Sequence, residues 1–178
     1  MSRYITFLRA INVGGHTVKM DHLRAIFESL GLANVETFIA SGNVIFESPT
    51  KNAATLEKKI ATRLRDDLGY EVATFIRTTD ELAAIARHQP FRQADFDRAV
   101  TFNVAFLAEP LDPTGRKKLF ALKTAIDDFA VNGREIYWLC RKKQSESTFS
   151  NAVLEKTIGK PATLRGRNTL KKMAEKYA

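Results

Sequence analysis

The order of the predicted helices and strands repeats along this chain of 178 residues. In each half a strand is followed by a helix, two strands joined by a short turn, a second helix and a last strand. The first half predicts these elements at residues 4–11, 21–30, 35–40, 44–47, 56–68 and 71–77. The second half predicts them at residues 100–107, 114–123, 128–131, 135–140, 150–158 and 162–165, with a further helix from residue 168.

Hydrophobic periodicity and turn residues support these elements. Leu23, Ile26, Phe27 and Leu30 follow the spacing that places side chains on one face of a helix. The Asn132-Gly133 pair between two strand patterns is a strong hairpin signal. Each crossover helix therefore leads into a hairpin or a chain break, which argues against one continuous parallel sheet.

The sequence thus predicts an α+β fold of two tandem ferredoxin-like subdomains with antiparallel sheets. Each subdomain is a split βαβ arrangement with the order βαββαβ. We expect the first subdomain at residues 1–77, a connecting helix and loop at residues 78–98, and the second subdomain with a basic C-terminal helix at residues 99–178.

Two loops of the first subdomain are predicted to meet and form a binding patch. In a split βαβ unit the first and second strands are parallel, so the loops that follow them lie at the same edge of the sheet. Loop amides and the start of a helix beside an arginine can hold an anion. The predicted ligand-binding residues are Arg9, Asn12, Gly14, Gly15, Lys19, Ser41, Gly42 and Asn43.

Structural explanations of the same residues stay open. Residues 12–15 can be a loop that needs unusual backbone angles, and residues 41–43 can be a tight turn in which Asn43 binds the backbone. Arg9 can be buried and paired with a carboxylate such as Glu36 or Glu47, in which case its loss lowers stability.

Positive charge gathers at the C-terminal end of the chain. The formal net charge is +8, and residues 156–178 hold seven basic residues and one acidic residue. Such clustering is typical of a polyanion contact, although a solvated helix face gives the same pattern. The predicted polyanion contacts are Arg165, Arg167, Lys171 and Lys172.

The sequence identifies no reaction. The three histidines have no metal-ligand spacing, no nucleophile is paired with a base, and the glycines match no nucleotide-binding motif, so we predict no metal site and no cofactor. No stretch of 18 apolar residues and no leader pattern is present, which predicts a cytoplasmic protein without a membrane partner. The single cysteine, Cys140, is expected to be a buried structural thiol.

Several segments resemble a bacterial family known as domain of unknown function 1697. The resemblance lies in residues 7–15 (FLRAINVGG), 37–46 (TFIASGNVIF), 102–107 (FNVAFL), 151–156 (NAVLEK) and 168–170 (NTL), and so extends over nearly the whole chain. It implies a pair of ferredoxin-like α/β subdomains in a soluble bacterial protein. It implies no activity, because this family has no assigned reaction, cofactor or substrate.

Two adjacent positions depart from the family pattern. Members commonly have Asn and Trp where this chain has Gly166 and Arg167. If the tryptophan belongs to a shared ligand site, that site is altered here. If it only packs the last helix, Arg167 adds surface charge instead.

The leading functional hypothesis is a non-catalytic binding protein for a phosphate-bearing ligand, either nucleic acid or a phosphorylated small molecule. One alternative is an enzyme that binds a small anionic substrate at the patch around Arg9, Asn12 and Ser41. Another is a protein-interaction module that uses an exposed sheet face or edge. The sequence does not define an oligomeric state.

Overall fold

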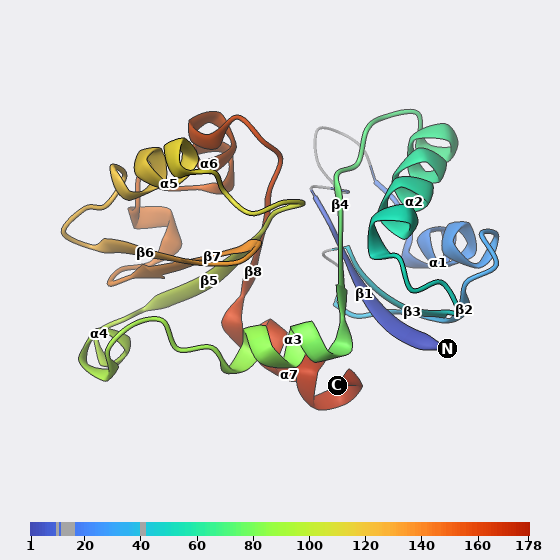
Figure 1. Ribbon diagram of the computed structural model, residues 1–178, viewed down its shortest axis with the longest axis horizontal. Coiled ribbons are helices and arrows are strands. Elements are labelled where there is room, and N and C mark those ends of the chain that lie inside the picture. Colours follow the sequence, from blue (N-terminus) through green and yellow to red (C-terminus); the bar gives the residue numbers. More distant parts are fainter. Residues whose placement is uncertain (10, 12–16, 40–41) are drawn as a thin grey trace. The chain divides into compact units, whose positions relative to one another are not determined.

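The chain forms two compact units (Figure 1). The computed structural model describes residues 1–9, 11, 17–39 and 42–178. Met1–Ala83 and Met173–Ala178 belong to the first unit, and Ala84–Lys172 form the second. The predicted limits of the subdomains, 1–77 and 99–178, stay a prediction, because contacts within a unit do not show which segments fold independently.

The described residues of the first unit form a four-stranded antiparallel sheet with the strand order β2-β3-β1-β4. Helices α1 and α2 lie on one face of this sheet (Figure 1). The strands are β1 (Ser2–Leu8), β2 (Ala33–Thr37), β3 (Asn43–Ser48) and β4 (Thr74–Thr78), and the helices are α1 (Met20–Glu28), α2 (Ala53–Leu68) and the start of α3 (Thr79–Arg87), whose last four residues belong to the second unit.

The sequence sets the limits of the helices in this unit. The Asn52 side chain accepts a hydrogen bond from the Thr55 backbone N–H and so caps α2, and Gly69 ends the helix in the left-handed conformation at φ 83°. Leu56, Ile60 and Leu64 are the buried residues of α2 and pack into the core against the sheet. Each fully buried side chain of this kind contributes about 1.5 to 3 kcal/mol.

The second unit repeats this arrangement with the strand order β6-β7-β5-β8, again antiparallel in the part of the chain that the structure describes. Its strands are β5 (Thr101–Phe106), β6 (Asp127–Asn132), β7 (Glu135–Cys140) and β8 (Thr163–Gly166). Its helices are α4 (Gln93–Asp97), α5 (Pro113–Phe120), α6 (Asn151–Ile158) and the start of α7 (Arg167–Tyr177), with a 3-10 turn, η1 (Gln144–Glu146).

The predicted α+β class with antiparallel sheets is confirmed. Several boundaries differ from the predicted ones. The first strand ends at Leu8 rather than at residue 11, α4 lies in a segment that was expected to be a loop, and α7 follows β8 without an intervening residue. Among the described residues, no helix is both long enough and apolar enough to cross a membrane.

A buried carboxylate organises the core of the second unit. Asp127 is 2% exposed, and its oxygens accept hydrogen bonds from the Trp138 indole at 2.9 Å, the Ser147 hydroxyl at 2.8 Å and the Thr124 hydroxyl at 2.7 Å. Burial alone raises the pKa of Asp127, but these hydrogen bonds outweigh burial and hold that pKa below its ordinary value. The charged form is therefore the one that the fold stabilises.

Replacing Asp127 is expected to destabilise the protein. Asp127→Ala removes the acceptor of three donors and should lower the free energy of unfolding by about 2 to 4 kcal/mol. The neighbouring Asp128→Ala is the matched control and should cost less than about 1 kcal/mol, because Asp128 is half-buried and binds its neighbour's N–H and Lys123. Urea denaturation followed by circular dichroism measures both, and equal losses would contradict this role of Asp127.

The same carboxylate predicts a pH dependence. Because its folded pKa is lowered, its contribution is complete above the unfolded pKa of about 3.9 and is lost as the pH falls through the folded value. The difference in stability between the wild type and Asp127→Asn should therefore be constant near neutral pH and shrink below about pH 4. A difference that grows on acidification would contradict the assignment.

Candidate functional site

The structure brings part of the predicted Arg9 patch together. The Leu8 backbone N–H donates to the Gly42 carbonyl at 2.9 Å, so the end of β1 and the β2–β3 connection are adjacent. Gly42 has φ +83°, and a Cβ added there would lie 3.1 Å from the Leu8 Cβ. Glycine is therefore required at this position by backbone conformation and by close packing.

Asn43 has a structural use in this turn. Its side chain is completely buried, and its amide donates to the Phe38 carbonyl at 3.0 Å. The Phe38 N–H donates in turn to the Asn43 carbonyl at 3.0 Å, so the two residues close the turn. This geometry agrees with the structural explanation of Asn43.

The other members of the Arg9 patch are placed less fully. Arg9 is half-buried and its N–H donates to the Ala73 carbonyl at 3.0 Å, while Lys19 is exposed just before α1. Asn12, Gly14, Gly15 and Ser41 lie outside the described residues. Ligand binding at this patch stays a prediction.

Both carboxylates that were considered as partners of Arg9 bind other groups. Glu47 forms an ion pair with Arg3 at 3.0 Å and accepts a hydrogen bond from Asn34, and these contacts lower its pKa. Glu36 accepts a hydrogen bond from the Tyr177 hydroxyl at 3.0 Å and lies 3.8 Å from the Lys176 ammonium.

The four predicted polyanion contacts divide into two kinds. Arg165, on β8, is only 8% exposed, and its guanidinium donates to the Thr163 hydroxyl at 2.7 Å and to the Leu164 carbonyl at 2.9 Å. Burial lowers the pKa of Arg165 to about 10. Arg167, Lys171 and Lys172 lie in α7, where Lys171 and Lys172 are exposed and Arg167 is half-buried.

Arg167 and Lys171 line a hollow of 460 Å³ in the second unit, which we call the α7 hollow. Its walls come from α4 and the residues after it, from β5, and from the junction of β8 with α7. The lining residues are Gln93, Phe96, Asp97, Ala99, Val100, Thr101, Phe102, Gly166, Arg167, Asn168, Thr169 and Lys171.

Two aromatic rings hold the guanidinium of Arg167. Its central carbon lies 5.0 Å from the centroid of the Phe96 ring and 5.0 Å from that of the Phe102 ring. Its Nε is buried, and within the described part of the chain it has no hydrogen-bond partner. Burial lowers the pKa of Arg167, and Tyr137 partly opposes this effect. Cation–π contact therefore positions this side chain.

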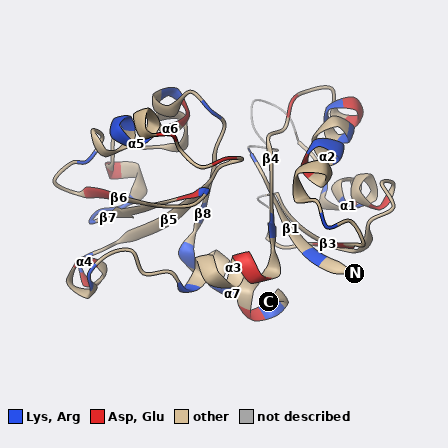
Figure 2. Ribbon diagram, viewed as in Figure 1, with Lys and Arg blue, Asp and Glu red and all other residues tan. Residues whose placement is uncertain are grey.

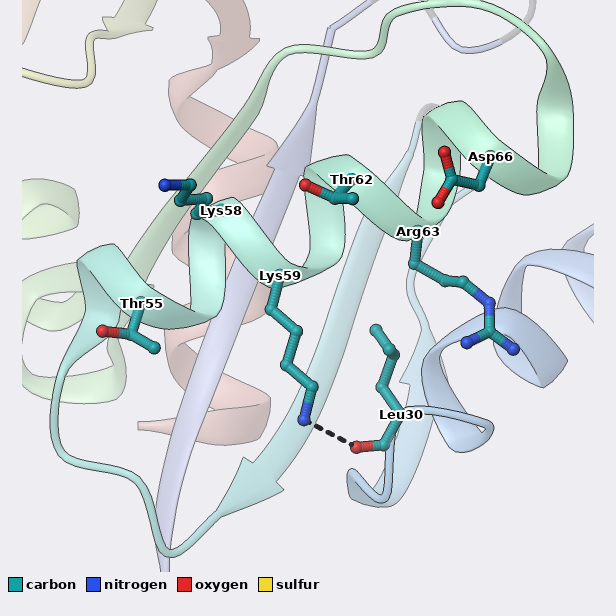
Figure 3. Close-up of a pocket in the computed structure, with 7 residues that line it drawn as sticks. All are labelled: Leu30, Thr55, Lys58, Lys59, Thr62, Arg63 and Asp66. Carbon is teal, nitrogen blue, oxygen red and sulfur yellow. Dashed lines mark hydrogen bonds between the residues drawn. The ribbon is translucent and has the colours of Figure 1, made fainter.

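Neither Arg167 nor Lys171 forms an ion pair with any residue that the structure describes. Other groups bind some of the cations of two other hollows. A groove of 530 Å³ lies beside α2, where Lys59 donates to the Leu30 carbonyl at 3.3 Å (Figure 3) and Arg63 pairs with Asp67 at 3.1 Å.

The third hollow, of 280 Å³, is lined by Arg92, Asp95 and Arg141 among other residues. Asp95 pairs with Arg92 at 3.3 Å, with Arg98 at 3.2 Å and with Arg141 at 3.4 Å. Figure 2 shows basic residues on both α2 and α7. Lys58 and Lys59 of the α2 groove also lack an ion pair among the described residues. The contact of Arg167 with two rings, together with Lys171 in the same lining, therefore distinguishes the α7 hollow as the place where an anion can bind.

The residues of α4 were not predicted as part of a site. Phe96 lies in a five-residue helix that is too short to give a periodic signal. Its ring contacts Arg167, which is 71 positions later in the sequence. No local pattern could have identified this contact. Among the described residues no group of three His, Cys, Asp or Glu side chains could hold a metal ion.

Comparisons with known proteins identify a family and a fold. The family model described as "Protein of unknown function (DUF1697)" matches residues 1–137. The solved structure of the conserved bacterial protein SP0830 from Streptococcus pneumoniae has 23% sequence identity and a TM-score of 0.75, and the match covers 99% of each chain. No curated protein matches the chain. The likeness to the solved structure supports the fold alone.

The contact between Asn43 and Phe38 gives a test of the structural explanation. Asn43→Ala should lower the free energy of unfolding by about 1 to 3 kcal/mol, because it leaves a partly buried carbonyl without its donor. Lys19→Ala, at an exposed member of the same patch, should change it by less than about 0.5 kcal/mol. Chemical denaturation measures both values, and a neutral Asn43→Ala would contradict the structural role.

Proposed function

The chain belongs to the DUF1697 family, whose description assigns no function, and we propose that it is a non-catalytic binding protein for a phosphate-bearing ligand. We propose the α7 hollow as the binding site. The observation that carries this proposal is one hollow that holds Arg167, fixed by two rings, and Lys171, neither of which has an ionic partner among the described residues.

The chemistry of these two side chains fits a phosphate. A guanidinium presents N–H donors in a plane that matches two phosphate oxygens, and an ammonium adds a compact charge. Arg167 and Lys171 are four positions apart in α7, so they lie on the same face of the helix. One phosphate group can therefore contact both cations.

The first turn of α7 adds to this environment. Gly166, Asn168 and Thr169 line the hollow beside Arg167. Backbone N–H groups in the first turn of a helix have no partner within the helix and favour negative charge. They support the two cations in the proposed site but do not define it.

The other polar groups of the hollow are suited to holding a ligand in one orientation. Asp97 accepts a hydrogen bond from the Gln93 side chain at 2.8 Å, and Asn168 is exposed at the rim. Carboxylate and amide groups can bind hydroxyl or amino groups of a ligand next to its phosphate. This lining supports recognition and gives no reason to assign a reaction.

Two finer points belong to the same proposal. We infer that each unit has the ferredoxin-like form of the split βαβ fold, because the strand order 2-3-1-4 with antiparallel neighbours is the order that two split βαβ units produce. We also infer a cytoplasmic bacterial protein, which is supported by the bacterial source of the structural relative and by the lone buried Cys140.

Removal of the cations tests the proposed site. Arg167→Ala should weaken binding of inorganic pyrophosphate and of ribose 5-phosphate by about 10- to 100-fold, because a charge-assisted hydrogen bond contributes about 1.5 to 3 kcal/mol. Lys171→Ala should weaken both by several-fold. Isothermal titration calorimetry at low salt measures these affinities.

The control is Lys117→Ala, which removes an exposed lysine of α5 that lies outside the hollow. It changes the net charge by the same amount as Lys171→Ala and should leave both affinities within about twofold. Equal effects of Lys117 and Lys171, or a wild-type protein that binds neither compound at low salt, would overturn the proposal.

A further inference from the structure

We infer that the phosphate-bearing ligand of the α7 hollow is a nucleotide unit whose base stacks on the guanidinium of Arg167. This inference rests on the proposed function and names the class of its ligand. It depends on the arrangement of Arg167, Phe96 and Phe102, which provides a flat surface next to the groups that can hold the phosphate.

The two rings lie on the same side of the guanidinium. The Phe96 and Phe102 centroids are 5.2 Å apart, and each is 5.0 Å from the guanidinium carbon, so the three groups form a nearly equilateral triangle. A guanidinium clamped between two rings would hold their centroids about twice as far from each other as from itself. One side of the Arg167 guanidinium is therefore left without a ring from this pair.

We place the base of the inferred ligand on that second side. Arg167 is half-buried and lines the hollow, so the exposed part of its side chain faces the hollow or its rim. The two rings hold the guanidinium in place before a ligand arrives. A group that is already ordered loses little conformational entropy on binding.

A guanidinium can bind through its face and its edge at once. Its face is planar and weakly hydrated and stacks on aromatic rings, including nucleic-acid bases. Its edge carries the N–H donors that match phosphate oxygens. A nucleotide has both a flat base and a phosphate, whereas a sugar phosphate can use only the edge.

The remainder of the hollow fits the same ligand. Its volume of 460 Å³ lies within the range of about 300 to 1,000 Å³ that is usual for small-ligand sites, which is enough for one nucleotide unit. The side chains of Gln93, Asp97 and Asn168 can bond to ribose hydroxyls or base edges. A base in a duplex has no free face, so the nucleotide is either free or part of a single strand.

The test compares ligands that differ only in the base. AMP and UMP should bind about 5- to 100-fold more tightly than ribose 5-phosphate, which is the range expected for one stacked base. Arg167→Lys keeps the charge and removes the planar face, so it should bring the three affinities within about twofold of one another. Calorimetric titrations of the whole chain at one low salt concentration give these ratios.

Two further variants separate stacking from charge and from folding. Lys171→Ala should weaken AMP and ribose 5-phosphate by the same factor and leave their ratio unchanged. Phe102→Leu removes one of the rings that hold Arg167 and should reduce the ratio, and a thermal melt shows whether that variant is folded. Because Arg167→Lys is a conservative change at a half-buried position, it tests the inference even if Phe102→Leu fails to fold.

The outcomes are distinct. Equal affinities of wild-type protein for AMP, UMP and ribose 5-phosphate would overturn the nucleotide inference and leave phosphate binding intact. An unchanged ratio in Arg167→Lys would also overturn it. No binding of any of these compounds would overturn the proposed function itself. A single-stranded oligoribonucleotide that binds much more tightly than AMP identifies a strand as the ligand, whereas equal affinity identifies the free nucleotide, and either result supports the inference.

Discussion

Burial of the central strands on both faces is the constraint on which each unit depends. Every residue of β1 from Tyr4 to Leu8 is at most 2% exposed, and every residue of β7 is at most 9% exposed. A strand of this kind cannot alternate apolar and polar side chains, so it is a nearly continuous apolar run. A charged group beside such strands is stabilised by hydrogen bonds within the unit, as Asp127 is beside the buried strand β7.

The strand register of the two sheets shows a structural repeat that is not visible in the amino-acid sequence. Arg77 on β4 pairs with Ile5 of β1, and Arg165 on β8 pairs with Val104 of β5, so the two arginines occupy equivalent positions. Each is buried and donates to the carbonyl of the residue before it, Ile76 or Leu164. A helix follows each of these strands directly. The units are thus similar in construction even where their side chains differ.

The sequence predicted this construction because order and periodicity are local properties. The predicted hairpin at Asn132-Gly133 is present, and the helix with Leu56, Ile60 and Leu64 has the expected buried face. Arg165 shows why the site was harder to predict. Its charge suggested an exposed side chain, but Arg165 is buried on the four-residue strand β8. The sequence of one short strand does not show which face of its sheet other elements cover.

The α7 hollow was incompletely predicted for a related reason. The charge of residues 156–178 directed attention to α7, where Arg167 and Lys171 line the hollow, but charge does not show which cations have partners. Asp95, between Arg92 and Arg98 in sequence, binds three arginines. Its neighbourhood is therefore basic in composition and largely neutralised in structure. Only a folded chain distinguishes such a cluster from free cations.

Arg167 combines packing with charge in a way that affects the cost of binding. Contact with Phe96 and Phe102 removes part of the water around its guanidinium, and burial lowers its pKa. Arginine is the most basic side chain and is not deprotonated in proteins, so Arg167 keeps its charge near neutral pH. Folding has thus already removed some of the water that the guanidinium would otherwise lose when it binds a phosphate. A cation held in this way attracts an anion more strongly than a fully hydrated surface lysine does, because the local dielectric is lower and the geometry is already set.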